Sequence, residues 1–118
     1  MKISRRDVVE VIFGSNTKAN HSVIVLSPEE VNSEEEQFLG IMVTDSPYFD
    51  AGNEYSFPLD DSMFLKPLRE KTSKARLYLI NFLSTRAIVN KVKINEMKGL
   101  AFEAMIKDLN TKIFGIKC

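Results

Sequence analysis

Apolar and polar residues alternate over short segments through most of the chain, and a helical period appears only near its C-terminus. Runs rich in β-branched and aromatic residues, separated by clusters of turn-forming residues, are typical of strands. The pattern predicts five or six strands, at residues 6–13, 21–27, 38–44, 54–59, 74–83 and 85–94. The second of these is mostly apolar, so we expect it to be buried on both faces.

One long helix is predicted after Asn95, where apolar residues recur at spacings of three and four. The expected apolar stripe comprises Met97, Leu100, Ala101, Ala104, Met105 and Leu109. This stripe is expected to plug the barrel or, as the family resemblance given below would suggest, to contribute to a dimer face. A one-turn helix is also expected near Pro28, with Ser27 as N-cap and Glu30 completing a capping box. Residues 32–37 are then expected to be a polar loop.

The order of these elements indicates the fold class. Strands come first and the helix last, so the chain lacks the alternation of strand and helix that a parallel α/β fold requires. We therefore expect a mainly β α+β fold, a small antiparallel barrel or curled sheet with a C-terminal amphipathic helix. A chain of 118 residues is expected to form one domain, spanning 1–118. Residues 60–73 are expected to be a long connection with a short turn at 61–65, and Pro58 to lie near a sheet edge.

The amino-acid composition excludes or disfavours several classes of function. Lys and Arg together number 16, as do Asp and Glu, so the net charge of zero disfavours a wholly basic polyanion binder but allows a local basic patch. Neither a signal peptide nor a transmembrane run is recognised, so a cytoplasmic protein is expected. With one cysteine, Cys118, and one histidine, His21, the sequence predicts no disulfide, no metal and no cofactor.

Five segments follow one another along residues 5–110, namely RRDVVEVIF, HSVIVLSPEEVN, LGIMVTDS, YSFPL and ARLYLINFLSTRAI. This ordered series resembles the PemK/MazF-like toxins of bacterial toxin–antitoxin systems. The string VIVLSPEEVN is its most specific part. The resemblance implies an SH3-like barrel, a homodimer and a metal-independent endoribonuclease that cuts messenger RNA at short sequences. It also implies an antitoxin partner that blocks the groove for single-stranded RNA.

The resemblance also aligns candidate site residues. The family keeps an Arg-Pro pair at the head of its second strand, with a catalytic arginine, and this chain has His21-Ser22 there. The family's threonine at the end of the third strand falls on Thr44. An acidic residue and a glutamine, which the family often has late in the long strand, are replaced by Asn81 and Phe82.

Cleaving RNA without a metal requires proton transfer from the 2′-hydroxyl and to the leaving 5′-oxygen, with donors or a cation near the phosphorane. A histidine titrates near neutrality and can carry either proton, so His21 is the candidate. Arg86 is the candidate cation, and Thr44 and Ser46 are candidate phosphate donors. The structural alternative is that His21 is a polar residue at a loop end and the other three are ordinary surface residues.

A basic segment over residues 66–76 is the candidate RNA-binding region. Its cations are Lys66, Arg69, Lys71, Lys74 and Arg76, against one acidic residue, and Lys18 precedes His21 in the chain. Such a segment could hold the RNA backbone through phosphate contacts, or could be a solvated loop. The segment SEEEQ at residues 33–37, with three glutamates, would repel RNA, so it is expected on another side of the molecule.

Two further functions remain open. A toxin-like barrel whose catalytic set has decayed would act as a nucleic-acid- or protein-binding module, and the replacements at His21, Asn81 and Phe82 favour that reading. A different toxin activity, such as gyrase poisoning, is the third hypothesis. The retained Thr44 and the titratable group at position 21 favour the nuclease.

Overall fold

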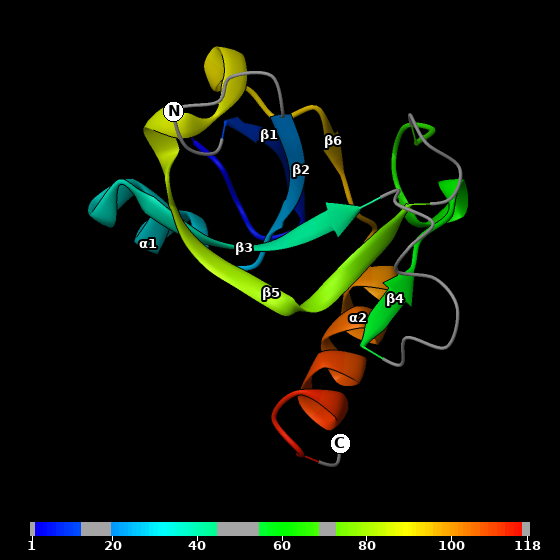
Figure 1. Ribbon diagram of the computed structural model, residues 1–118. Coiled ribbons are helices and arrows are strands. Elements are labelled where there is room, and N and C mark those ends of the chain that lie inside the picture. Colours follow the sequence, from blue (N-terminus) through cyan, green and yellow to red (C-terminus); the bar gives the residue numbers. More distant parts are fainter. Residues whose placement is uncertain (1, 13–19, 45–54, 69–72, 117–118) are drawn as a thin grey trace.

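The computed structural model describes residues 2–12, 20–44, 55–68 and 73–116, and its centre is one curled antiparallel sheet (Figure 1). The sheet has six strands in the order β4-β5-β3-β2-β1-β6, and every pair is antiparallel. The strands are β1 (Asp7–Ile12), β2 (Asn20–Val25), β3 (Gln37–Thr44), β4 (Ser56–Pro58), β5 (Lys74–Ser84) and β6 (Asn95–Glu96). The helices are α1 (Glu29–Glu35) and α2 (Gly99–Lys112), which follows the sheet in the chain. The expected fold class is confirmed.

The central strands are apolar on both faces, because each face has its own core. Val9, Val11, Val23, Val25 and Phe38 form one cluster with Ile3 and Ile88. The other cluster includes Val8, Ile24 and Ile41 and is covered by α2 through Phe102, Met105 and Leu109. Three consecutive residues of β2, 23–25, are therefore fully buried, as predicted for a strand buried on both faces.

A large irregularity in β5 curls the sheet. Ile80 lies opposite Ile41 and Ala75 opposite Val43, so residues 76–79 of β5 face the single residue Met42. Extra residues on one strand bend it and increase its twist, and Figure 1 shows β5 bent sharply in its middle. The segment after β4 then reaches β6. Leu65 N donates to Glu96 O at 3.0 Å and Lys98 N donates to Met63 O at 2.7 Å.

The C-terminal helix begins later and buries a different stripe than the sequence pattern predicted. Asn95 lies in β6 rather than opening the helix, and Met97 forms a bridge with Phe64. Leu100 is 85% exposed, whereas Phe102, which was absent from the expected stripe, is buried. The error has a geometric cause: starting the helix at Gly99 removes Met97 from it, and the helix docks with Phe102, Met105 and Leu109 toward the sheet.

Other local predictions were also wrong. Residues 85–94 do not form a strand: they contain two short 3-10 helices, at Thr85–Ala87 and Val89–Lys91, and Asn90 and Lys91 have left-handed φ angles of 56° and 53° that a strand cannot contain. Helix α1 is longer than one turn and occupies much of the expected 32–37 loop. Its N-cap is Pro28, and the Ser27 hydroxyl does not cap it. The turn at Asp61–Met63 and the edge position of β4, which contains Pro58, are confirmed.

The Ser27 hydroxyl instead joins a buried polar group centred on Asn32. Ser27 Oγ donates to Asn32 Oδ1 at 2.5 Å and accepts from Leu39 N at 2.8 Å. Asn32 Nδ2 donates to Ile3 O at 2.9 Å and to Ser27 O at 3.1 Å. One amide therefore ties the N-terminal segment, α1 and β3 together.

Replacing Asn32 with alanine is expected to lower the free energy of unfolding by about 2 kcal/mol, because two buried carbonyls lose their donor. Urea denaturation would measure the change. Ser33→Ala, at an exposed position of the same helix, is the matched control and should change stability by less than about 0.5 kcal/mol. Equal losses in the two variants would contradict the role given to the amide.

An ion-pair group at the start of β1 makes stability depend on pH. Lys93 Nζ lies 2.8 Å from Glu96 Oε1 and 3.4 Å from Asp7 Oδ1. The hydrogen bond from Lys93 is the main reason that the pKa of Glu96 lies below its ordinary value of 4.5, although partial burial opposes the shift. A depressed carboxyl pKa stabilises the fold above the unfolded pKa, and that stabilisation is lost as pH falls through the folded pKa.

Acidification from neutral pH to below 4.5 is therefore expected to destabilise the native protein more than Lys93→Met, which lacks the donor. Urea midpoints measured across this pH range would test the prediction. Equal slopes of stability against pH in the two proteins would contradict it.

Candidate active site

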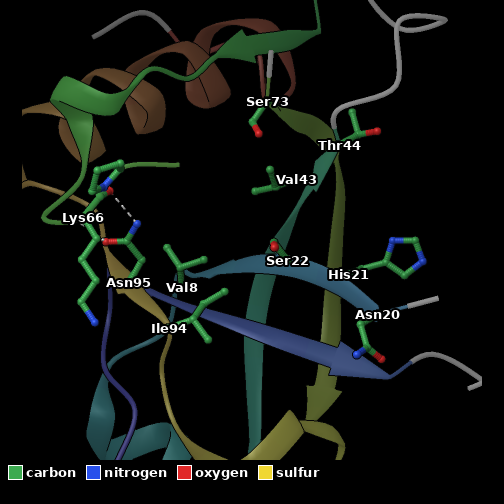
Figure 2. Close-up of a pocket in the computed structure, with 11 residues that line it drawn as sticks. Val8, Asn20, His21, Ser22, Val43, Thr44, Lys66, Ser73, Ile94 and Asn95 are labelled. Carbon is green, nitrogen blue, oxygen red and sulfur yellow. Dashed lines mark hydrogen bonds between the residues drawn. The ribbon is translucent and has the colours of Figure 1, made fainter. Parts of the chain in front are cut away.

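A pocket opens where β2 separates from β3. Ladder pairs between the two strands cover only residues 23–25 of β2, whereas β2 stays paired with β1 from Asn20 to Ile24. Among the described residues, the first three of β2 therefore have a ladder partner only in β1. The space beside them is a cavity of about 520 Å³, and Figure 2 shows its lining residues.

The pocket combines an apolar base with polar groups around it. Val8, Val43 and Ile94 lie in the middle of the view, between polar side chains that come from several elements (Figure 2). The polar lining comprises Asn20, His21, Ser22, Thr44, Lys66, Ser73 and Asn95. The set contains an imidazole, three hydroxyls, two amides and one ammonium, which are groups that can bind a phosphodiester and move a proton.

His21 and Thr44, predicted from distant parts of the sequence, both line this pocket. The ladder between the two strands ends at the pair Val23–Met42. His21 precedes Val23 by two residues and Thr44 follows Met42 by two, so both lie at the end where the strands separate. On its other side His21 is paired with Val11 of β1, so its backbone position is fixed by a regular ladder. The strand head therefore presents the imidazole at the rim, as Figure 2 shows.

Lys66 lies across the pocket from His21, and a side chain of β6 holds its backbone. Asn95 Nδ2 donates to Lys66 O at 3.0 Å, and Lys66 N donates to Asn95 Oδ1 at 3.0 Å (Figure 2). The amide thus pairs with the backbone of Lys66 much as a neighbouring strand would. This contact places an exposed ammonium-bearing residue at the pocket edge.

The structure does not bring Arg86 to this group within one chain. Arg86 follows β5 and lies 3.7 Å from Glu36, beside the start of β3, whereas Thr44 ends β3. Eight residues of strand span about 23 Å, which separates Arg86 from the pocket. The acidic residues before β3 lie at that same distant end, on another side from the pocket as expected.

The remaining basic candidates divide into two groups. Lys74 begins β5 directly opposite Thr44, and Arg76 follows it beside Ser56 of β4. Three basic candidates, Lys18, Arg69 and Lys71, lie outside the described residues, as does the candidate phosphate donor Ser46. The expected basic segment therefore contributes Lys66 to the pocket lining and Lys74 to its neighbourhood.

Sequence reasoning missed Ser22, Ser73 and Asn95 as pocket residues. Ser22 was considered only as the residue that follows His21. Its position at the head of the same strand could have identified it as a candidate pocket residue. No local signal marks Ser73 or Asn95. They reach the pocket only because the curled sheet brings β5 and β6 around to the open end of β2.

The described residues include neither a metal-binding cluster nor a membrane-spanning helix. They contain no group of three or more His, Cys, Asp or Glu side chains that could hold a metal ion. No helix within them is long and apolar enough to cross a membrane.

Comparison with solved structures shows what this architecture is similar to. A MazE–MazF complex from Deinococcus radiodurans matches with a TM-score of 0.73 and 14% identity, covering 99% of both chains. The toxin MazF-mt6 of Mycobacterium tuberculosis matches at 0.72 and 12%, over 96% of this chain and 100% of that one. The chain has a MazF-like fold. A mycobacterial endoribonuclease in complex with its cognate antitoxin also matches, at 0.70 and 12%, over 99% and 97% of the two chains.

The likeness to MazF lies in the fold, since every identity just given is below 15%. No family model matches the sequence, and no curated protein matches it. The likeness nevertheless extends over nearly the whole length of both chains. The MazF-like fold of this chain therefore includes α2 as well as the sheet.

Proposed function

We propose that this protein is a metal-independent, sequence-specific messenger-RNA endoribonuclease, the toxin of a toxin–antitoxin pair. The observation that carries the proposal is the pocket at the head of β2, which combines His21, Thr44 and Lys66 within a MazF-like fold. Two of the solved neighbours are described as endoribonuclease and toxin, which supports the same activity. The site residues are our assignment, because the identity to those proteins is too low to transfer roles.

In the proposed reaction the 2′-oxygen of the RNA attacks the adjacent phosphorus and the bond to the 5′-oxygen breaks. The imidazole of His21 takes the proton from the 2′-hydroxyl and returns it to the 5′-oxygen. The hydroxyl of Thr44 donates to a phosphorane oxygen, where negative charge develops. The products are a 2′,3′-cyclic phosphate end and a 5′-hydroxyl end, so atoms and protons balance without a metal.

The partners follow from the same assignment. We propose single-stranded RNA as the substrate, an antitoxin protein as the inhibitor and a homodimer as the active form, in the cytoplasm. Solved neighbours described as MazE–MazF and as an endoribonuclease with its cognate antitoxin support an antitoxin partner. An antitoxin that covers the pocket would inhibit by excluding RNA from His21.

The deciding experiment is incubation of the purified, folded protein with a long single-stranded RNA in EDTA. Discrete cuts with cyclic-phosphate ends are expected, and mapping of the cut sites would define the sequence preference. RNA that is bound but stays intact over a wide range of protein concentrations would overturn the nuclease and favour the decayed binding module. Cuts that need added metal would overturn the metal-free mechanism alone.

Lys66→Ala is expected to weaken RNA binding and to make binding less sensitive to salt. Loss of one phosphate contact on a single strand reduces the slope of log affinity against log salt by about 0.7. Fluorescence anisotropy over a series of salt concentrations would measure the slope. Lys107→Ala, an exposed lysine of α2, is the matched control and should leave the slope unchanged. Equal slopes for native protein and Lys66→Ala would remove Lys66 from the RNA-binding surface.

A further inference from the structure

The backbone groups on each edge of β2 can be identified from the neighbouring strands. Ile94 N donates to Val8 O at 2.8 Å, so the backbone of Val8 faces β6 and its pair with Ile24 of β2 is non-hydrogen-bonded. The backbone groups of Ile24 therefore face β3. Two residues further on, Leu26 N donates to Leu39 O of β3 at 2.7 Å, as this alternation requires.

The same alternation places the backbone N–H of Ser22 on the edge that faces β3. The ladder between β1 and β2 runs through Ser22 to the start of the strand without a shift, so the strand is regular there. The ladder between β2 and β3, however, ends at the pair Val23–Met42, and no pair of Ser22 with Val43 follows it. Within the described part of the chain, the N–H of Ser22 therefore has no acceptor.

The space in front of this N–H is the pocket. β3 stays paired with β5 at Val43 and Thr44, beyond the irregularity that bends β5, while it leaves β2. Ser22 and Val43 both line the pocket, as Figure 2 shows. The gap between the two strands thus opens into the pocket, and the N–H of Ser22 lies at its wall.

This N–H belongs to the peptide bond that follows His21, the proposed proton carrier. The described residues contain no cis peptide bond, and a trans peptide directs its C=O and its N–H to opposite sides. The C=O of His21 therefore faces β1, where His21 is paired with Val11. One end of the peptide is held in a ladder while the other faces the pocket. A donor fixed in this way needs no reorganisation when charge develops in front of it.

The charge of the pocket favours an anionic acceptor for this donor. Lys66 contributes an ammonium group to the lining, and neither Asp nor Glu is among the described residues that line the pocket. Hydrogen bonds from a neutral donor to an ionised acceptor are stronger than those to a neutral one. A phosphate oxygen is thus a better partner than water for the N–H of Ser22.

We propose that the main-chain N–H of Ser22 is a catalytic donor, which binds a non-bridging oxygen of the scissile phosphate and stabilises the phosphorane. The inference rests on the proposed function, to which it adds a second donor beside the hydroxyl of Thr44. The N–H keeps its proton throughout, so the proton transfers through His21 are unchanged. The bond strengthens as negative charge develops on the oxygen, and it therefore lowers the barrier.

The first test observes the N–H directly and does not depend on catalysis. Titration of the native protein with inorganic phosphate is expected to move the amide proton of Ser22 downfield in the NMR spectrum, because a hydrogen bond to an anion deshields the proton. The amide of Ile24 is the matched control, since it faces the same edge but lies within the ladder to β3. A Ser22 amide that moves no more than that of Ile24 would overturn the proposal.

The second test separates the N–H of Ser22 from its hydroxyl. Ser22→Ala removes the hydroxyl and keeps the N–H, whereas Ser22→Pro removes both. Proline is tolerated in a strand where its nitrogen makes no ladder bond, so both variants should unfold near the native temperature. Ser22→Ala is expected to cleave RNA in EDTA at close to the native rate. Ser22→Pro should cleave about 10²–10³-fold more slowly, the usual loss for one oxyanion donor.

The loss should appear in the cleavage rate and not in the affinity for RNA. Anisotropy should give similar affinities for the two variants, because an interaction that strengthens only in the transition state changes the rate and not the binding. A folded Ser22→Pro protein that cleaves as fast as Ser22→Ala would overturn the proposal. Equal losses in both variants would also overturn it, since they would assign the effect to the hydroxyl.

Failure of the proposed function has a different signature. A native protein that cuts RNA but shows no phosphate-dependent shift at Ser22 would keep the nuclease and overturn the donor. A native protein that shows the shift but cuts no RNA would overturn the nuclease, and with it the catalytic part of the proposal, while sustaining the phosphate contact.

Discussion

His21→Ala is expected to slow RNA cleavage by about 10²–10⁴-fold, the usual contribution of a positioned proton carrier. The chain has only one histidine, so within this protein no second imidazole can take over the transfer. Binding should be nearly unchanged, since Lys66 and the pocket hydroxyls remain. Single-turnover cleavage measured beside anisotropy would separate the two effects.

The variant should also keep its fold, because His21 is only partly buried at the open end of β2. Circular dichroism and the thermal midpoint would verify this. Lys107→Ala provides a control for general effects of mutagenesis and should cleave at the native rate. Cleavage by His21→Ala at the native rate would keep the enzyme but assign its proton transfer to another group.

Gly40→Ala is expected to lower the free energy of unfolding by about 3 kcal/mol and the thermal midpoint by roughly 10–15 °C. A Cβ at this position of β3 would lie 2.2 Å from Cγ1 of Val23 and 3.2 Å from Cε2 of Phe38. Both neighbours are completely buried in one core, so neither can move without displacing others. The close approach of β2 to β3 thus depends on a residue without a side chain.

Gly99→Ala is the matched control, since its Cβ would meet only Nη1 of Arg6 at an ordinary 3.5 Å. Alanine within a helix is favoured over glycine by up to about 1 kcal/mol, so this variant should be neutral or more stable. Thermal unfolding followed by circular dichroism would compare the two. A Gly40→Ala protein as stable as Gly99→Ala would contradict this prediction, because it would show that Val23 and Phe38 can rearrange to accommodate the added Cβ.

The strands were the most predictable part of the fold, because period-two patterning and β-branched content are local properties. Each of the first five predicted strands corresponds to an observed one. The prediction of a sixth strand was wrong at Asn90 and Lys91, because no pattern in VNKVK distinguishes a left-handed turn from a continuing strand. The prediction of the buried helix face was wrong at Leu100 and Phe102, because the face that a helix buries depends on how it docks on the sheet and not on the helix sequence alone.

The pocket was only partly predictable for a similar reason. His21 and Thr44 stand at a strand head and a strand end, positions that a series of strands already implies, and both lie beyond the same end of the β2–β3 ladder. Ser73 and Asn95 join them through the curvature of the whole sheet, which no single segment encodes. Arg86 was chosen for its charge, and strand length alone places it at the far end of β3.

The pairing of β1 with β6 has a kinetic consequence. Asp7 lies opposite Glu96, so the first strand completes its ladder with almost the last part of the sheet. Contacts so distant in sequence close large loops and slow folding. On a ribosome β2 and β3 can pair early, but Asn95 cannot reach Lys66 until residue 95 has emerged. The pocket is therefore completed only after β6 has been synthesised, later than the pairing of β2 with β3.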